Sequence, residues 1–406
     1  MRYAWLVLIV AAALAALFCL TVRNTSAQAK AVADEIASAC GIQVDVRACY
    51  ARRISELIPY DVSVAFATIA ILHERGLLDA CHYLLHPIGE AAYERYAKTG
   101  DTSFMLPEAA LCNYGFYHGF IIKLLEDDPG IATTRAFCDS LKPTLLERRP
   151  DVRDQCYHGV GHGLLDITIG SVGSIDDPAW VRSTLGRSTP IALQQCALLG
   201  ETAENDCISG VFHESAMLQE ERRWYTDPRD PLWLCRESAE EYQPRCFGNM
   251  DRLFFKVYPS LAARDVVVRV QELYGNDERI VRNVVRRFAS RAAMREPDIQ
   301  EVIGYCREIP DQYQEFCLEG AIAGIVEEGV AGEEYRLGLS FCSAPELSPA
   351  EKDACVEYAF TYFSGIYPAS KMRSLCAKYE ELRPQRCGIS VPRGFLGSLA
   401  ANPVRR

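Results

Sequence analysis

Apolar positions along this chain recur mostly at helical spacing. Segments such as "VFHESAMLQEERRWY" (211–225) and "RIVRNVVRRFASRAAMR" (279–295) repeat apolar residues three or four positions apart, which is the spacing of one helix face. Runs that alternate apolar and polar residues, as in half-buried strands, are scarce. The pattern therefore predicts an all-α protein. We interpret the arginine-rich segment as an amphipathic helix with a solvated face, and a docking surface for an acidic partner or lipid headgroups is the alternative.

The cysteines predict short, local disulfides. Seventeen are present, and without Cys19 sixteen remain, which fall into neighbouring pairs along the chain. The predicted pairs are Cys40/Cys49, Cys81/Cys112, Cys138/Cys156, Cys196/Cys207, Cys235/Cys246, Cys306/Cys317, Cys342/Cys355 and Cys376/Cys387. Ten residues separate the cysteines in four of these pairs, and one recurring spacing favours local pairing. An even, disulfide-bonded set indicates the periplasm or another oxidising extracytoplasmic space.

The segments that begin at the second cysteine of a pair resemble one another. "CNYGFYHGF" (112–120), "CYHGVGHGL" (156–164), "CISGVFHES" (207–215) and "CLEGAIAGI" (317–325) all have glycine three residues after cysteine. Between paired cysteines the chain is polar and broken. We therefore expect each unit to be a helix, a disulfide-clamped turn and a second helix starting at the next cysteine. Such units stack into a solenoid or a closed helical toroid.

The N-terminus carries an uncharged run from Tyr3 to Val22, which is long enough to span a bilayer. We interpret it as an uncleaved transmembrane anchor, with a cleaved signal peptide as the alternative. The predicted organisation is a membrane anchor or signal with a short linker (1–29), a His-rich helical-repeat half (30–245), a cysteine-free helical connection (246–305) and a His-free helical-repeat half (306–406).

The net charge of −11 argues against nucleic acid as a partner, because phosphate binding needs a basic face. The expected partners are the membrane, through the N-terminal helix, and a protein or peptide on the concave face of the helical array.

Six of the seven histidines lie in or beside the cysteine-headed segments, and the seventh, His73, stands apart. Residues four apart share a helix face, so we expect the histidines to converge where units stack. Pro87 predicts that the helix around His86 starts or kinks there. The candidate metal ligands are His82, His86, His118, His158, His162 and His213, and the candidate catalytic carboxylates are Glu90 and Glu214.

Imidazole is the commonest protein metal ligand, and such a cluster suits zinc, copper or iron. Six imidazoles allow a binuclear redox site, whereas three or four with a carboxylate suit metal-assisted hydrolysis. Histidines that merely fill space and bond the backbone are the alternative. The segment "CLEGAIAGI" carries Ala323 where three other segments have histidine, so the packing does not require an imidazole.

The sequence thus predicts an exported, membrane-anchored metal-binding protein, and we expect a histidine-ligated metalloenzyme, either a hydrolase or an oxidoreductase. The alternative is a disulfide-stapled helical-repeat scaffold that binds a protein or peptide and contains structural histidines.

Overall fold

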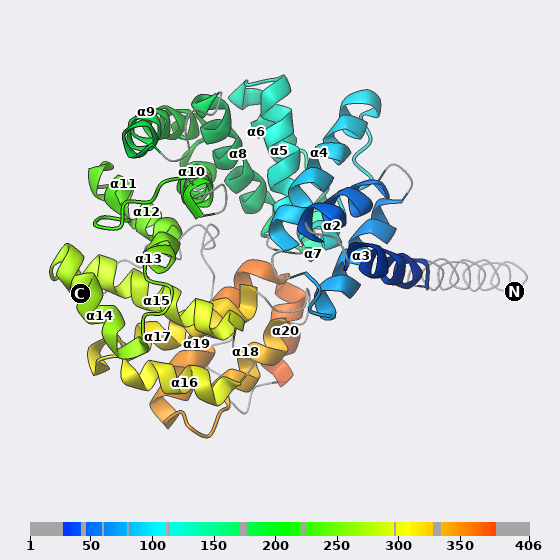
Figure 1. Ribbon diagram of the computed structural model, residues 1–406. Coiled ribbons are helices and arrows are strands. Elements are labelled where there is room, and N and C mark those ends of the chain that lie inside the picture. The colour runs from blue at the N-terminus through cyan, green and yellow to red at the C-terminus, as the bar shows by residue number, and fades with distance from the viewer. Residues whose placement is uncertain are drawn as a thin grey trace, which may run out of the picture. The chain divides into compact units, whose positions relative to one another are not determined.

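A computed structural model describes residues 27–41, 46–58, 61–78, 81–110, 112, 114–170, 177–220, 224–295, 298–327 and 334–378 of the chain (Figure 1). All regular elements in these ranges are helices, which confirms the predicted all-α class. The chain forms two compact units, residues 1–120 and 121–406, and each is described by itself. The predicted division into four segments stays a prediction.

The first unit contains three labelled α-helices, a short 3-10 helix and the start of a further helix. Residues 27–40 are also helical. The labelled elements are α2 (Val46–Ser55), α3 (Val62–Glu74), α4 (Cys81–Thr99), η1 (Pro107–Ala110) and α5 (Gly115–Asp127), whose C-terminal half belongs to the second unit. α2 packs against α3 and α4. Phe66, Phe104, Phe116 and Phe120 are fully covered and form the core of this unit.

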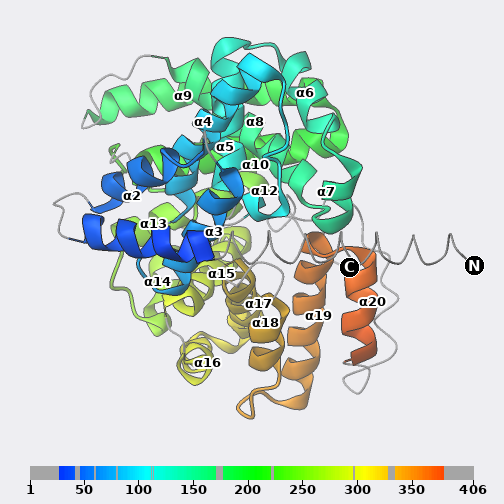
Figure 2. The same ribbon diagram turned by 90° about the vertical axis from the view of Figure 1, so that its right-hand side faces the viewer.

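The second unit consists of helices and the segments that connect them. Its elements are α6 (Ile131–Asp139), α7 (Pro143–Arg148), α8 (Val152–Ile169), α9 (Pro178–Cys196), η2 (Ala197–Leu199), α10 (Glu201–Glu220), α11 (Trp233–Glu237), α12 (Gln243–Met250), α13 (Arg252–Val257), α14 (Ala263–Tyr274), α15 (Glu278–Arg295), α16 (Ile299–Glu308), α17 (Asp311–Glu327), α18 (Glu334–Cys342), α19 (Pro349–Ile366) and α20 (Ala369–Lys378). α10 packs on α8, α9 and α12, whereas α17 packs on α15 and α19. Figure 2 shows α18, α19 and α20 running side by side.

The disulfides follow the predicted local scheme. Six of the predicted pairs are present: Cys40–Cys49, Cys138–Cys156, Cys196–Cys207, Cys235–Cys246, Cys306–Cys317 and Cys342–Cys355. Cys112 and Cys376 are disulfide-bonded as well. Cys387, the predicted partner of Cys376, lies outside the described residues, and the pairing of Cys81 with Cys112 stays a prediction.

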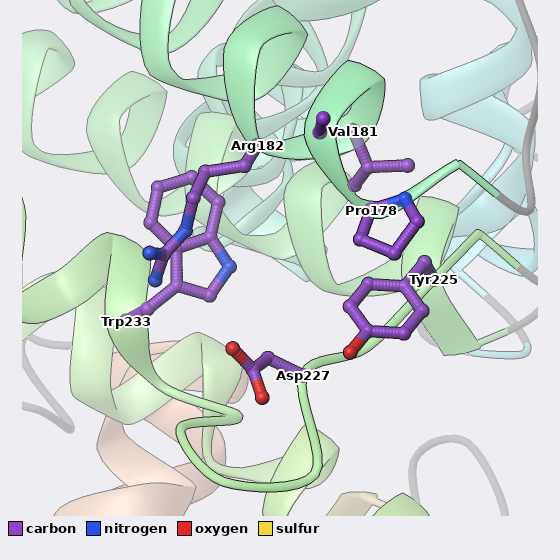
Figure 3. Close-up of a pocket in the computed structure, with 7 residues that line it drawn as sticks. Pro178, Val181, Arg182, Tyr225, Asp227 and Trp233 are labelled. Atoms are coloured by element: carbon purple, nitrogen blue, oxygen red, sulfur yellow. The ribbon is translucent and has the colours of Figure 1, made fainter.

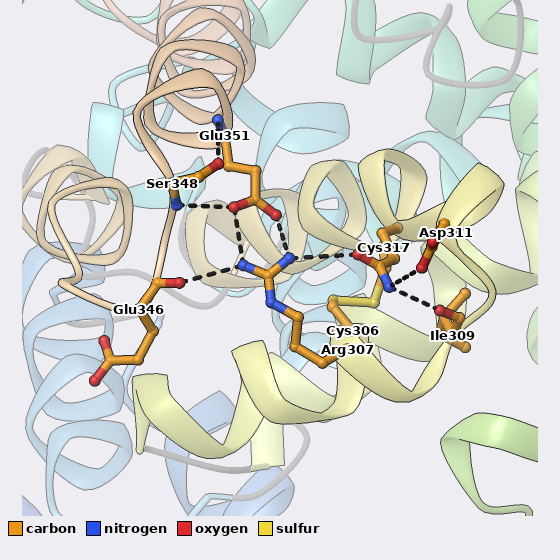
Figure 4. Close-up of polar contacts among 9 residues, drawn as sticks. Cys306, Arg307, Ile309, Asp311, Cys317, Glu346, Ser348 and Glu351 are labelled. Carbon is orange, nitrogen blue, oxygen red and sulfur yellow. Dashed lines mark hydrogen bonds and ion pairs between the residues drawn. A yellow bond between two sulfur atoms is a disulfide. The ribbon is translucent and has the colours of Figure 1, made fainter.

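The helices begin earlier than the sequence predicted. Most of the second helices start several residues before their cysteine, because polar residues of the expected turn form the first helical turn. α19, for example, begins at Pro349, six positions before Cys355, and Ser348 and Glu351 form a capping box. The carboxylate of Glu351 also binds the guanidinium of Arg307 at the end of α16, beside the Cys306–Cys317 bridge (Figure 4).

Glycines allow α4 and α5 to touch backbone to backbone. A Cβ atom built on Gly115 would overlap the carbonyl oxygen of His82, and one on Gly119 would overlap that of His86. Only glycine lets two helices approach so closely. The recurring glycine therefore marks a helix contact, as the sequence indicated, and this contact fixes the register of the two helices.

The same contact recurs in two helix pairs of the second unit. In the α8–α10 pair, a Cβ on Gly210 would overlap the carbonyl oxygen of His158. In the α15–α17 pair, a Cβ on Gly320 would overlap that of Arg286, and one on Gly324 that of Ser290. Three helix pairs therefore share one packing arrangement, and the register of each pair shows which residues correspond.

The arginine-rich segment forms α15, as predicted, but part of its basic face is covered. Arg286, Arg287 and Arg291 have side chains only 19–21% exposed. Arg286 pairs with Glu319 of α17, with Nε and Oε2 2.6 Å apart. The helix therefore uses several arginines for ion pairs with neighbouring helices, whereas Arg279 and Arg282 keep the expected exposure.

The predicted anchor, Tyr3–Val22, lies outside the described residues. Among the helices that the structure does describe, none is both apolar enough and long enough to cross a membrane.

Candidate functional site: two histidine clusters

The first histidine cluster consists of His82, His86 and His118. α4 supplies His82 and His86, one turn apart, and α5 supplies His118, three residues after the contact glycine Gly115. One ring nitrogen from each of the three lies within 4.8 Å of the others. α4 is helical from Cys81 to Thr99 and includes Pro87, so the helix does not start at His86, and the two histidines share a face as predicted.

The distances within the first cluster match those of a metal site. Nε2 of His82 lies 3.3 Å from Nε2 of His86 and 3.3 Å from Nδ1 of His118. Nitrogens bound 2.0–2.1 Å from a tetrahedral zinc lie about 3.3–3.4 Å apart. Two of the three nitrogen–nitrogen distances are therefore those of ligands on one ion, and the third lies within 4.8 Å.

A backbone carbonyl fixes the proton of His82. The Nδ1 atom of this ring lies 3.0 Å from the carbonyl oxygen of Cys112. Because a carbonyl only accepts, Nδ1 carries the proton and Nε2 keeps its lone pair toward the other two histidines. Metal-binding histidines typically donate their outer N–H in this way.

The chain is strained next to this carbonyl. Cys112 and Tyr114 have left-handed backbone conformations, with φ of 54° and 63°, which few non-glycine residues adopt. Such conformations cost about 1–3 kcal/mol each and cluster at functional sites. The strained turn lies where the Cys112 carbonyl accepts from His82.

The first cluster has a covered side and a more open side. His118 is buried, whereas His82 and His86 are partly exposed. Glu90, one turn beyond His86 on α4, is exposed and is not one of the three grouped side chains. Its predicted catalytic role stays a prediction.

The second histidine cluster consists of His158 and His162 of α8 and His213 of α10. Nε2 of His158 lies 3.1 Å from Nε2 of His162 and 3.0 Å from Nδ1 of His213. The three ring centroids are 4.9–5.2 Å apart. The histidines that the sequence placed on corresponding faces of neighbouring helices therefore meet within this unit.

Charged side chains form hydrogen bonds with the outer ring nitrogens of the second cluster. The buried carboxylate of Glu214 lies 2.8 Å from Nδ1 of His162, which is itself buried. Arg252, at the start of α13, donates from a terminal guanidinium nitrogen to Nε2 of His213 over 2.8 Å. Glu214 thus faces His162 rather than its neighbour His213, as expected for adjacent residues on a helix.

Sequence reasoning did not identify Arg252. The segment "GNMDRLFF" around it matches no motif. Arg252 reaches the cluster because α13 packs against α10, and this contact depends on tertiary structure. No local sequence signal could have placed this arginine beside His213.

The third helix pair, α15–α17, lacks histidines at the corresponding positions. Its contact glycines align Arg286 with His82 and His158, and Ser290 with His86. Ala323, three residues after Gly320, corresponds to His118 and His213. Because the glycine contacts persist there, the helix packing does not depend on imidazole rings.

A separate recess lies in the second unit, away from the predicted site residues. Pro178, Val181 and Arg182 of α9 face Tyr225, Asp227 and Trp233 across a cavity of about 320 Å³ (Figure 3). The guanidinium of Arg182 stacks 4.6 Å from the ring centre of Trp233. The stacked side chains of Arg182 and Trp233 therefore form one wall of this recess.

Searches of protein-family models, curated proteins and solved structures find no match to this chain.

Proposed function

We propose that this protein is an exported metalloprotein whose first histidine cluster binds a transition-metal ion. The observation that carries the proposal is the convergence of three imidazole nitrogens within 4.8 Å, two of the distances being 3.3 Å, with the proton of His82 held on the outer side. Three neutral nitrogen donors favour zinc, copper or iron over magnesium or calcium, which prefer oxygen.

The partly exposed side of the cluster supports an enzymatic role. Catalytic zinc sites keep three protein ligands and leave one position for water or substrate. A metal ion in this environment lowers the pKa of a bound water molecule and so supplies a nucleophile near neutral pH. We therefore propose a metalloenzyme, and we favour hydrolysis over oxidation because the first cluster groups three imidazoles rather than the six of a binuclear redox site.

The disulfides support export. Six bridges, together with two further disulfide-bonded cysteines, indicate an oxidising compartment. We propose that the segment Tyr3–Val22 directs the chain there and serves as its membrane anchor.

The metal content of the purified protein tests the proposal. After growth with added zinc, copper and iron, elemental analysis should find at least one equivalent of one metal per chain. His118→Ala should remove the metal bound at the first cluster without unfolding the chain, because Ala323 occupies the corresponding position in the α15–α17 pair. His73→Ala is the matched control, since this histidine bonds the carbonyl of Leu78 outside either cluster.

Two results would contradict the proposal. One is a folded wild type with less than a few tenths of a metal ion per chain. The other is a His118→Ala variant that keeps the full metal content. Either result, with folding unaffected by a chelator, would favour the scaffold that binds a protein or peptide.

A further inference from the structure

The two clusters differ in which ring nitrogen of a histidine, the outer or the inner one, carries the proton. In the first cluster the outer partner of His82 is the Cys112 carbonyl, an acceptor, so the lone pair of Nε2 points inward. In the second cluster the outer partner of His213 is Arg252, and a guanidinium only donates. The lone pair of His213 Nε2 therefore accepts from Arg252 on the outer side of the cluster.

This contact decides the tautomer of His213. Because Nε2 accepts from Arg252, a neutral ring carries its proton on Nδ1. That nitrogen lies 3.0 Å from Nε2 of His158 and donates to it. The inward nitrogen of His213 is thus a donor, and it occupies the lone pair that His158 would give to a metal ion.

Arg252 is held firmly in this role. Its side chain is 16% exposed, and its Nε lies 2.5 Å from a carboxylate oxygen of Glu220. The same carboxylate lies 3.6 Å from a guanidinium nitrogen of Arg291. Since an arginine side chain keeps its protons at all accessible pH values, the donor beside His213 is permanent.

We propose that Arg252 limits the number of metal ions that the chain binds, because it keeps His213 from acting as a ligand. The inference rests on the proposed function of the first cluster. That cluster offers three inward nitrogens and binds zinc. Of its own three histidines, the second cluster has only His158 and His162 with ring nitrogens that can accept an ion, and it stays a hydrogen-bonded cluster without tightly held zinc.

Removing the guanidinium should create a second zinc site. In Arg252→Met the proton of His213 is free to move to Nε2, so that Nδ1 turns its lone pair inward. We expect wild type to retain one zinc per chain after dialysis against a competing chelator and Arg252→Met to retain two. Outer partners of metal-bound histidines change metal affinity about 10- to 100-fold, and we expect a gain of this size.

Three further variants control the experiment. Arg287→Met removes a guanidinium of similar exposure that pairs with Asp251, and it should leave one zinc. Arg252→Lys retains a cationic donor and should also leave one. His213→Ala should not change the zinc content of wild type, but in the Arg252→Met background it should reduce the content from two to one.

The inference is overturned if wild type already holds two zinc ions and His213→Ala removes one. A folded Arg252→Met variant that still holds one zinc overturns it as well. If Arg252→Met does not fold, His213→Ala in the wild-type chain decides, because loss of zinc there identifies His213 as a ligand. If wild type binds no zinc while Arg252→Met gains one ion that depends on His213, the inference stands and the proposed function fails.

Discussion

Gly119→Ala tests whether the helix contact of α4 with α5 builds the first cluster. A Cβ atom at this position would overlap the carbonyl oxygen of His86 and lie 2.6 Å from its Cα atom. Ordinary van der Waals contact begins near 3.4 Å. The two helices must therefore separate by about 0.8 Å or more, because both atoms belong to the backbone and have no rotamer to adopt.

The stability cost follows from two opposing effects. Overpacking costs about 1–3 kcal/mol, and a clash with backbone belongs at the upper end of this range. Replacing glycine by alanine inside a helix returns about 1 kcal/mol. We therefore expect the free energy of unfolding to fall by about 2 kcal/mol. A shift of 0.8 Å also exceeds the roughly 0.2 Å that metal–ligand distances tolerate, so the cluster should lose its zinc.

Denaturant unfolding and zinc analysis of matched variants provide the assay. Gly320→Ala creates the same 2.6 Å approach, to Arg286 in the helix pair without histidines, and should lose similar stability but keep its zinc. Gly304→Ala in α16 meets nothing within 4 Å and should gain up to about 1 kcal/mol. A Gly119→Ala protein that binds zinc and unfolds like wild type would refute the reasoning.

Three further predictions concern ligand, disulfide and pH. Zinc at one hundred times its dissociation constant should raise the free energy of unfolding by about 2.7 kcal/mol, measured by thermal denaturation, and His118→Ala should abolish the rise. The double substitution Cys196→Ala/Cys207→Ala opens a loop with a sequence separation of 11 and should cost about 3 kcal/mol in denaturant unfolding; an unchanged midpoint would contradict this. Burial raises the pKa of Asp154 to about 6, so its ionisation destabilises the fold as pH rises from about 4 to 6. At pH 7 the free energy of unfolding of Asp154→Asn should therefore exceed that of wild type by up to about 3 kcal/mol in denaturant unfolding. The difference should vanish near pH 4.

The sequence predicted features that depend on local spacing. Histidines four positions apart had to share a helix face, and the Nε2 atoms of His82 and His86 are 3.3 Å apart. The recurring glycine indicated close helix contact, and Gly115 and Gly119 lie against the backbone of α4. The recurring short separation favoured local pairing of neighbouring cysteines, and six of the predicted bridges are present.

The sequence could not predict features that depend on how helices dock. The helix starts differ because residues such as Ser348 and Glu351 cap their helix from within the expected turn. Glu214 faces His162, and Arg252 faces His213, through contacts between elements far apart in the chain. The spacing of residues within one helix does not determine which face a neighbouring helix turns toward it. Sequence reasoning therefore could not predict which ring nitrogen of each histidine carries the proton.

A comparison of the three helix pairs shows that they share the glycine contacts but differ in the side chains at the corresponding positions. Each pair uses glycine to bring two backbones together, and each then presents three corresponding positions. In the α15–α17 pair these are Arg286, Ser290 and Ala323, and Arg286 forms an ion pair with Glu319. In the other two pairs they are histidines, yet an acceptor lies outside the first cluster and a permanent donor outside the second. The number of metal ions that the chain binds should therefore follow the outer partners of its histidines, not the number of histidines.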